Sequence, residues 1–402
     1  MGRQEDGRRT TGVGTLAAAT TRDTCDVVVI GLGIMGAATV ARLAERGVRV
    51  LGVESGRPTH TAGSSHGSTR IFRRAYWEGG TYLPLLERAH AGWYELDADG
   101  SADGRVVLST GGLFVGAATS RLVSGSRQTA VAHSIPHEVL AGEDVRRRFP
   151  AFHLRDDEVA LVEPDAMMLA AQTARAAYLA RATRAGARLA YDRRVRSLTS
   201  SASAVTVAGD GWEVSCARVV VAAGGWAQSL LPHDLAGLVR PMRIPVFELD
   251  IDPRRAAEHQ PGAFPVFLVE SDDGALVYGL PPSRPGAGVR VGFHNRQLSP
   301  ADMDGPRVAV TAAELREVGE RVRRLLPGLR AEGRGTACVY TMTPDESFLL
   351  GMSHELPGVA YVSACSGHGF KFAPAIGEAM SELVLDGRTS VDISPFDASR
   401  LR

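Results

Sequence analysis

The sequence predicts an α/β protein of two domains: one built on a parallel sheet, and an α+β domain with a mixed, largely antiparallel sheet. The chain has 402 residues, which is long for a single hydrophobic core. Residues 26–54 place a glycine-rich turn and a helix between two β-branched runs, which is typical of a parallel sheet. Residues 242–300 read as consecutive strands joined by Pro/Gly turns, which is typical of an antiparallel sheet.

Composition narrows the classes of function. The chain carries 45 basic and 45 acidic residues, which argues against a nucleic-acid partner or an electrostatic membrane partner, because both need a basic excess. No stretch is long and apolar enough to span a membrane. The four cysteines lie far apart without a CxxC pair, which argues against a disulfide framework and against a zinc site. Free cysteines of this kind are typical of a reducing cytoplasm, which is the expected location. Residues 1–23 are polar and are expected to form a disordered extension rather than a signal peptide.

A dinucleotide-binding motif opens the predicted parallel sheet. Residues 26–30 predict a buried strand, and the run from Gly31 through Gly33 to Gly36 follows at once. A helix is predicted over 37–46, and then a second strand that ends at Glu54. The glycines allow a tight turn and a close approach to a pyrophosphate, and an acid roughly 20 residues on can hold ribose hydroxyls. The motif therefore predicts a Rossmann-like domain rather than a coincidental glycine-rich turn.

The polar segment over residues 63–76 favours a flavin over a nicotinamide. It follows the second strand and carries His66, Arg70 and Arg73 close to the predicted phosphate site. A glycine-rich segment of this kind suits a cofactor that stays bound rather than one that comes and goes. A solvated basic loop is the alternative, but three cations beside a phosphate site favour a functional role.

The remaining elements are predicted in chain order. We expect helices over residues 82–96, 143–149, 167–185, 311–326 and 374–385. We expect strands over 105–116, 159–162, 188–191, 195–198, 205–207, 214–222, 244–251, 266–269, 275–279, 288–293 and 359–363. Thr311 and Glu314 have the spacing of a capping box. The run from Gly224 to Trp226 suggests a second close approach of the backbone to the cofactor.

Two motifs near the C-terminus concentrate reactive groups. Cys338 precedes a turn-forming Thr-Pro-Asp, and Ser366–Phe372 is a glycine-rich entry into a helix. This entry carries Lys371, the single lysine among 45 Lys and Arg. An ammonium is a compact and adjustable charge, so we interpret Lys371 as a functional lysine in a pocket rather than a stray surface residue. A cysteine attacks best as a thiolate, a form that nearby cations favour, and the alternative for Cys338 is a small buried hydrophobe.

Together these motifs resemble the monomeric sarcosine oxidase and N-methyltryptophan oxidase family, which are FAD amine oxidases of the D-amino-acid-oxidase fold type. The resemblance covers nearly all of residues 24–396. It rests on the Gly31 fingerprint and on the motifs at 66–73, 278–279, 292–294, 338–348 and 366–372. It implies a discontinuous FAD-binding domain over 24–105, 160–240 and 335–402, and a substrate domain over 106–159 and 241–334.

The resemblance also implies roles for single residues. Cys338 matches the cysteine that bonds covalently to the flavin, and Arg73 and Lys371 match the pair that binds the substrate carboxylate. The implied catalytic residues are Arg73, Lys371, His294, Tyr278, Tyr340 and Arg290. The implied cofactor-binding residues are Gly31, Gly33, Ile34, Met35, Gly36, Glu54, Ser65, His66, Thr69, Arg70, Arg73, Val195, Gly224, Trp226, Cys338, Met342, Gly367, His368, Gly369, Phe370 and Lys371.

Two positions depart from the family's pattern. The oxygen-activating lysine of the family lies two residues before the Gly-aromatic-His triplet, and here that position is Arg290. Arginine keeps the positive charge but is larger and cannot lose its proton. The change reflects either a bias toward Arg codons, or slower use of oxygen, or a different electron acceptor. Ser68 replaces an acid that is usual in its motif.

The expected activity is flavin-dependent oxidation of the C–N bond of a secondary or N-methyl amino acid, giving an imine and, with molecular oxygen, hydrogen peroxide. One alternative is a flavin dehydrogenase or biosynthetic desaturase of a cyclic imino acid such as proline, pipecolate or a secondary-metabolite intermediate. Others are a flavin-holding interaction protein without activity and a nicotinamide dehydrogenase. We expect a monomer without an obligate protein partner.

Overall fold

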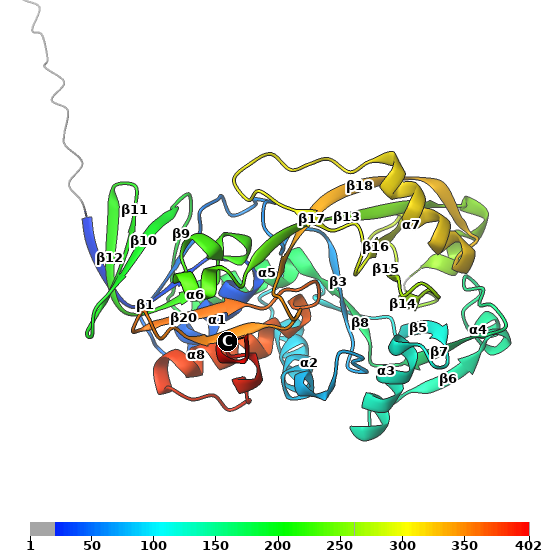
Figure 1. Ribbon diagram of the computed structural model, residues 1–402, viewed down its shortest axis with the longest axis horizontal. Helices are drawn as coiled ribbons and strands as arrows, with labels where there is room; N and C mark the ends of the chain where they lie inside the picture. The colour runs from blue at the N-terminus through cyan, green and yellow to red at the C-terminus, as the bar shows by residue number, and fades with distance from the viewer. Residues whose placement is uncertain (1–20, 261, 402) are drawn as a thin grey trace, which may run out of the picture.

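The computed structural model describes residues 21–260 and 262–401, arranged around two large sheets and one small sheet (Figure 1). The predicted disordered extension falls mostly on residues 1–20, outside the described residues. The first strand begins at Thr21, three residues before the boundary predicted at residue 24. No helix of the described chain is both long and apolar enough to cross a lipid bilayer.

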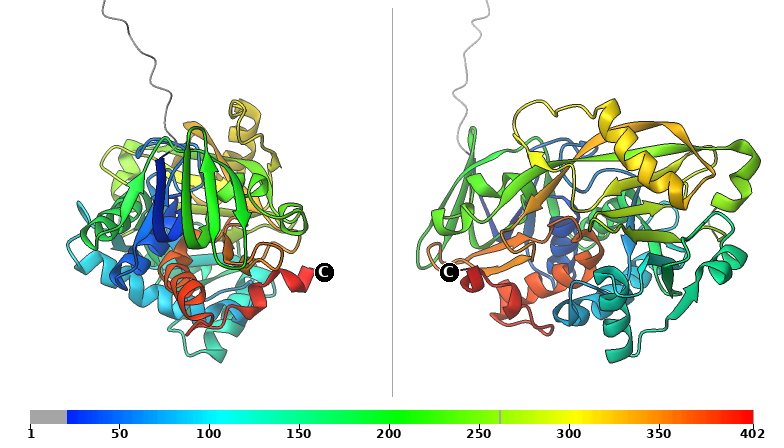
Figure 2. Two further views of the ribbon diagram at one scale, coloured as in Figure 1. Left: turned by 90° about the vertical axis from the view of Figure 1, so that its left-hand side faces the viewer. Right: turned by 45° about the vertical axis from the view of Figure 1, so that its right-hand side comes forward.

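The first sheet has eight strands and is the predicted nucleotide-binding sheet. Its strands are β1 (Thr21–Ile30), β2 (Val50–Val53), β9 (Arg188–Ala190), β10 (Val195–Ser200), β11 (Val205–Gly209), β12 (Trp212–Val221), β19 (Leu349–Met352) and β20 (Val359–Ser363). The central pairs β12–β1, β1–β2, β2–β9 and β12–β20 are parallel, and the left view of Figure 2 shows β1 beside β12. Every residue of β2 and β20 is buried, as expected for strands covered on both faces.

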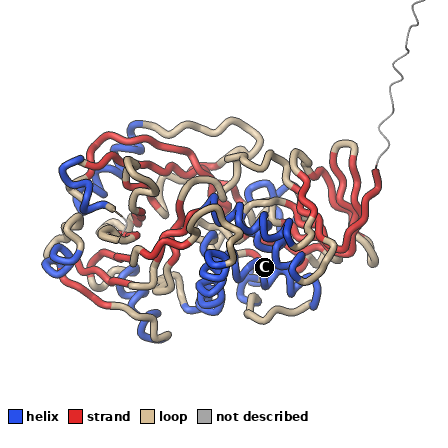
Figure 3. The backbone as a smooth tube through the Cα atoms, turned by 180° about the vertical axis from the view of Figure 1, so that it is seen from behind, coloured by secondary structure: helices blue, strands red, loops and turns tan. Residues whose placement is uncertain are grey.

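Helices cover the first sheet. Helix α1 (Ile34–Glu45) packs between α5 (Ala171–Arg184) and α8 (Ala373–Asp386), and α2 (Leu83–Ala98) packs on α8. Figure 3 shows these helices gathered next to the strands of this sheet. A Cβ added at Gly377 would lie 2.7 Å from the backbone of Ala38, so α1 and α8 approach more closely than larger residues would allow. The short helix α6 (His233–Ala236) precedes the chain's entry into the second sheet.

The second sheet has nine strands and is mixed but largely antiparallel, as predicted. Its strands are β5 (Gly112–Ala117), β6 (Glu138–Ala141), β7 (Glu158–Glu163), β13 (Arg240–Ile251), β14 (Val266–Glu270), β15 (Leu276–Leu280), β16 (Val289–Phe293), β17 (Ser299–Pro300) and β18 (Leu329–Met342). Only the β14–β5 pair is parallel among the pairs of this sheet in the described chain. Helix α7 (Ala312–Leu325) lies over the outer side, and its predicted capping box between Thr311 and Glu314 is confirmed.

A small sheet corrects one prediction. The helix predicted over 167–185 is wrong at its start, because Met167–Ala170 forms strand β8 and the helix α5 begins only at Ala171. Strand β8 lies between β3 (Thr69–Phe72) and β4 (Val107–Ser109), so pairing on both sides outweighs the local preference of a short apolar run for a helix. The sequence analysis also missed the strands β3, β6, β17, β18 and β19 and the helices α3 (Arg121–Ala132) and α6, whereas α4 (Gly142–Arg148) was predicted.

Candidate active site

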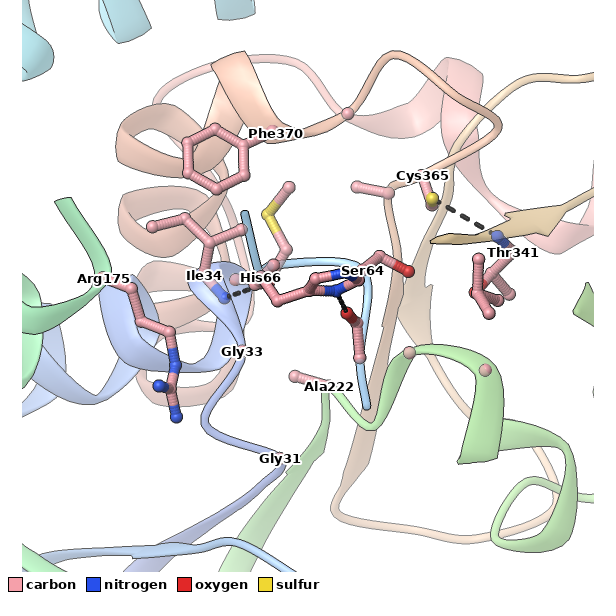
Figure 4. A pocket seen from close by; sticks show the side chains of 18 of the residues that line it. Gly31, Gly33, Ile34, Ser64, His66, Arg175, Ala222, Thr341, Cys365 and Phe370 are labelled. Carbon is pink, nitrogen blue, oxygen red and sulfur yellow. Dashed lines mark hydrogen bonds between the residues drawn. The ribbon is translucent and has the colours of Figure 1, made fainter. Parts of the chain in front are cut away.

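A large cavity of about 830 Å³ lies between the two large sheets. Residues that follow β1, β2, β12 and β20 line one wall, and side chains of β13, β15, β16 and β18 line the opposite wall. Carboxyl ends of parallel strands are the usual place for a ligand in a nucleotide-binding sheet. Figure 4 shows how Gly31, Gly33 and Ala222 border one end, with Phe370 and Cys365 further along.

The glycine motif forms a close-fitting cradle at one end of the cavity. Gly31 has φ +93°, and a Cβ there would lie 2.5 Å from the carbonyl oxygen of Ala222. The amide of Ile34, at the start of α1, donates to Ser65 Oγ over 2.9 Å. Gly36 does not line the cavity, because its Cβ would lie 1.8 Å from the oxygen of Gly31. Gly36 therefore permits the tight turn that shapes the cradle.

Glu54 presents a carboxylate to the same end of the cavity. Its Oε2 accepts a hydrogen bond from the Leu32 amide over 2.9 Å, and its Oε1 accepts one from the Gly56 amide over 3.1 Å. Burial alone would raise the pKa of Glu54, but hydrogen bonds from His60, Leu32 and Gly56 lower it to about 2. The carboxylate is therefore ionised, and Oε2 keeps room for a further donor such as a hydroxyl.

Arg175 is a cavity residue that the sequence analysis missed. Its Nε donates to the Leu32 oxygen over 2.6 Å, and its Nη1 donates to the Pro58 oxygen over 2.8 Å. Its Nη2 is buried and has no hydrogen-bond partner among the described residues. The side chain points from α5 toward the glycine turn (Figure 4) and braces this turn through the Leu32 and Pro58 carbonyls. No sequence signal distinguishes it from the other arginines of this helix.

Cys338 and His66 meet on the cavity wall. The Cys338 Sγ lies 3.6 Å from His66 Nε2, and His66 Nδ1 contacts the carbonyl of Gly63. Burial would raise the pKa of the Cys338 thiol, but the hydrogen bond to His66 and nearby cations lower it. The same hydrogen bond raises the pKa of His66. Arg70 is held by the carbonyls of Ser64, His66 and Thr69, each at 2.7 Å, and so braces the loop beside this pair.

Two buried cations lie together at the other end. Arg73 is 4% exposed and Lys371 is 5% exposed, and both line the cavity. The ring of Tyr76 lies 4.3 Å from the Arg73 guanidinium carbon and 5.0 Å from the Lys371 Nζ. Arg73 Nη2 is paired with Glu78 Oε1 over 2.5 Å. Burial and the charge of Arg73 lower the pKa of Lys371 to about 7.

Glu78 and Glu163 support this end, and the sequence analysis missed both. Burial would raise the pKa of Glu78, but the charge of Arg73 lowers it. Glu163 is fully buried and accepts hydrogen bonds from the amides of Arg74 and Ala75 over 2.7 and 2.9 Å. It therefore fixes the backbone directly after Arg73. An acid that ends an otherwise apolar strand was the available signal for Glu163.

The opposite wall carries Tyr278, Tyr340 and His294. Burial lowers the pKa of His294 to about 4, so its imidazole is neutral at physiological pH. Burial also raises the pKa values of both tyrosines. A Cβ at Gly367 would lie 2.7 Å from Tyr340 and 3.1 Å from His294, so this glycine lets the loop after β20 approach the wall.

Most of the predicted site residues line the cavity. They are Gly31, Gly33, Ile34, Met35, Glu54, Ser65, His66, Thr69, Arg70, Arg73, Val195, Gly224, Trp226, Tyr278, Arg290, His294, Cys338, Tyr340, Gly367, His368, Gly369, Phe370 and Lys371. Gly36 and Met342 do not line it. Met342 is the last residue of β18 and pairs with Arg240, beyond the part of the strand that faces the cavity. Arg290 Nη1 lies 3.4 Å from Ser68 Oγ.

A nucleotide-binding sheet whose cavity is closed by an antiparallel sheet defines a dinucleotide-dependent enzyme. The family model described as FAD dependent oxidoreductase matches residues 26–383. The chain is 35% identical over 384 residues to a monomeric sarcosine oxidase of Streptomyces avermitilis, covering 94% of this chain and 98% of that protein. It is 34% identical over 378 residues to an N-methyl-L-tryptophan oxidase of Yersinia pestis, covering 94% and 99%.

The chain therefore belongs to the FAD-dependent oxidoreductases and, within them, to the amine oxidoreductase family of monomeric sarcosine and N-methyltryptophan oxidases. Solved structures confirm the fold. The open form of NikD, an amino acid oxidase, matches with a TM-score of 0.80 at 24% identity over 93% of this chain and 97% of that one. Glycine oxidase from Geobacillus kaustophilus matches with a TM-score of 0.77 at 20% identity over 94% and 99%.

The cavity fits FAD on its own evidence. Gly31 lets the turn lie against the backbone of Ala222, where a Cβ would clash at 2.5 Å, so the turn and the start of α1 border the cavity closely. The ionised carboxylate of Glu54 lies at the same end and suits a hydroxyl pair. A glycine turn at a helix start beside a carboxylate matches a pyrophosphate and a ribose in one ligand.

Proposed function

We propose that this enzyme oxidises the C–N bond of a secondary or N-methyl amino acid to an imine and passes the electrons to oxygen, giving hydrogen peroxide. The observation that carries the proposal is that the buried side chains of Arg73 and Lys371 lie together at one end of the cavity. Arg73 is paired with Glu78, whereas Lys371 forms no ion pair among the described residues, so this end offers a guanidinium and an amine that an incoming carboxylate can engage together. The two relatives described above, a monomeric sarcosine oxidase and an N-methyl-L-tryptophan oxidase, support the same substrate class.

In this proposal the protein binds and orients while FAD, when bound, supplies the acceptor for a hydride equivalent. Arg73 and Lys371 hold the substrate carboxylate, and this fixes the carbon next to nitrogen relative to the opposite wall. The opposite wall is closed against water by Tyr278, Tyr340 and His294. Because these three side chains are neutral at physiological pH, the substrate carboxylate interacts with Arg73 and Lys371 instead. The backbone amides of Gly367 and Gly369 provide donors for negative charge, whereas the His368 amide already donates to the Cys365 carbonyl over 2.8 Å.

We infer a covalent link between the flavin and Cys338. The thiol lies on the cavity wall beside His66, and its lowered pKa favours the thiolate that such a bond requires. Cys365 also lines the cavity, but its sulfur accepts a hydrogen bond from the Thr341 amide over 3.3 Å, so we interpret it as a packing residue.

Other expectations stay predictions. They are the monomeric state, the cytoplasmic location and the division into an FAD-binding and a substrate domain. The predicted domain boundaries after residues 159 and 334 fall inside β7 and β18, so we propose moving them to the ends of these strands. A dehydrogenase or desaturase of a cyclic imino acid is not favoured by the names of the relatives above 30% identity.

The test is a panel of N-methyl and cyclic amino acids added to the yellow holoenzyme without oxygen. We expect N-methyl amino acids to bleach the flavin, and admission of air to restore the colour with one peroxide for each substrate oxidised. In Lys371→Met we expect a simple carboxylate inhibitor to bind at least tenfold more weakly, since a charge-assisted contact contributes roughly 1.5–3 kcal/mol. Unchanged inhibitor binding in this variant would rule out the carboxylate site.

A further inference from the structure

Lys371 has the surroundings of a neutral amine. Its Nζ donates to the His368 carbonyl over 2.6 Å and to the Tyr76 hydroxyl over 3.4 Å, and it forms no ion pair among the described residues. The nearby carboxylate of Glu78 is already paired with Arg73. A neutral amine has two N–H donors and one lone pair, whereas an ammonium has three donors. Two acceptors therefore satisfy the neutral form and leave its third position for the cavity.

A chain of hydrogen bonds fixes the direction of these donors. His368 Nε2 lies 3.1 Å from the Glu346 carbonyl, which can only accept, so Nε2 carries the proton and Nδ1 is the acceptor. Tyr76 OH lies 2.5 Å from that Nδ1 and donates to it. The Tyr76 oxygen is then free to accept from Lys371 Nζ. Among the described residues Nζ makes no third hydrogen bond.

Among the charged and titratable groups around Nζ, the Glu78 carboxylate favours a proton on Lys371, but burial and the charge of Arg73 outweigh it and lower the pKa of Lys371. These groups are Arg73, Glu78, Tyr76, His294 and His368. Burial lowers the pKa of His368 to about 3 and that of His294 to about 4, so both are neutral, and Arg73 repels a proton on Lys371. We therefore expect Lys371 to gain a proton when a further anion, such as a substrate carboxylate, binds beside it.

We propose that Lys371 takes the proton that the substrate's ammonium must lose, so that binding produces the reactive neutral amine and the carboxylate-holding ammonium in one step. The inference rests on the proposed function, in which the amino acid arrives as a zwitterion. One N–H bond breaks at the substrate nitrogen and one forms at Nζ, and no other reactant is needed. The substrate becomes an anion as Lys371 becomes a cation, so the total charge of the buried site is unchanged.

Opposite pH dependences follow for two kinds of ligand. A carboxylate without an ammonium needs Lys371 already protonated, so its dissociation constant rises tenfold per pH unit above the pKa of Lys371, about 7. A zwitterionic substrate brings its own proton. Its dissociation constant is therefore constant from about pH 7 to about pH 10, near the pKa of an ordinary alkylammonium, and rises tenfold per unit below about pH 7.

The experiment compares two probes on the holoenzyme from about pH 6 to 9. The first is (methylthio)acetate, in which sulfur replaces the N–H of sarcosine, measured by calorimetric titration. The second is the N-methyl amino acid that bleaches the flavin, measured by saturation of the anaerobic reduction rate. We expect the inhibitor to bind about fiftyfold more weakly at pH 9 than at pH 7, where half of Lys371 is already neutral, and the substrate affinity to change by no more than about twofold over that range.

Lys371→Arg is the matched control, because arginine keeps the charge but cannot accept a proton. In this variant we expect inhibitor binding to lose its pH dependence, and substrate binding to weaken tenfold for each unit of falling pH throughout the range. If the unaltered enzyme shows the two pH profiles expected for Lys371→Arg, the proposal about proton transfer is wrong, while the proposed function still stands. If no N-methyl amino acid bleaches the flavin, the proposed function itself fails.

Discussion

Neutralising Glu78 should lower the stability of the protein and, separately, raise its affinity for a ligand carboxylate. In Glu78→Gln, the Arg73 guanidinium loses its partner while its side chain is only 4% exposed. Breaking a buried pair in this way costs about 3–5 kcal/mol of unfolding free energy. The charge of Glu163 also acts on Arg73 and compensates part of the loss, so we expect about 3 kcal/mol.

A ligand carboxylate can then replace the missing partner. Because it no longer competes with Glu78, it should recover most of that free energy, and about 3 kcal/mol corresponds to roughly a hundredfold tighter binding. The assays are denaturant unfolding of the holoenzyme with and without (methylthio)acetate, and calorimetric titration of the same ligand. The control is Asp165→Asn, which removes a half-exposed partner of Arg74 and should cost less than about 1 kcal/mol. A Glu78→Gln enzyme with normal stability and normal inhibitor affinity would refute the reasoning.

Three further outcomes are expected. Cys338→Ser should leave the acid-precipitated protein colourless and the flavin in the supernatant, whereas Cys365→Ser should keep a yellow pellet. Gly36→Ala should prevent stable folding or flavin binding, since its Cβ would meet the backbone at 1.8 Å. Gly47→Ala should cost only about 1–2 kcal/mol in thermal unfolding, because its Cβ meets nothing within 4 Å and only the φ of +75° is strained. Arg290→Lys should speed reoxidation of the reduced enzyme by oxygen in stopped-flow measurements without changing its reduction by substrate, and an unchanged reoxidation rate would assign Arg290 no part in the choice of acceptor.

The parts of the fold that local pattern determines were predictable. The glycine motif with its flanking strands and the Thr311 capping box rest on short-range geometry, and the structure confirms both. Strand β8 was mistaken for the start of a helix because Met167–Ala170 is apolar at every position, which suits either structure. Its neighbours β3 and β4 decide the matter, and they come from segments roughly 60 to 100 residues away in sequence.

The site residues divide in the same way, into those that a local motif identifies and those that only the folded structure identifies. Residues in compact motifs, such as His66, Cys338 and Lys371, were identified, and the structure brings all three to one cavity. Arg175 was missed because its function depends on which side of α5 faces the glycine turn. Glu163 was missed because it acts through backbone amides of a distant loop, and such support leaves no motif of its own. Sequence patterns name the groups that meet the ligand more readily than the groups that hold them.

The place of β20 in the first sheet has a consequence for how the protein is made. Residues Val219–Val221 of β12 are fully buried, and they pair with Val359–Tyr361 of β20. At a synthesis rate of about 5–20 residues per second, the ribosome needs roughly 7–30 s to reach β20 after β12. During this time the nascent chain exposes an apolar, unpaired strand edge that can join another chain. Slower initiation or a lower growth temperature should therefore raise the yield of active recombinant protein, and a chain that stops before residue 359 should aggregate.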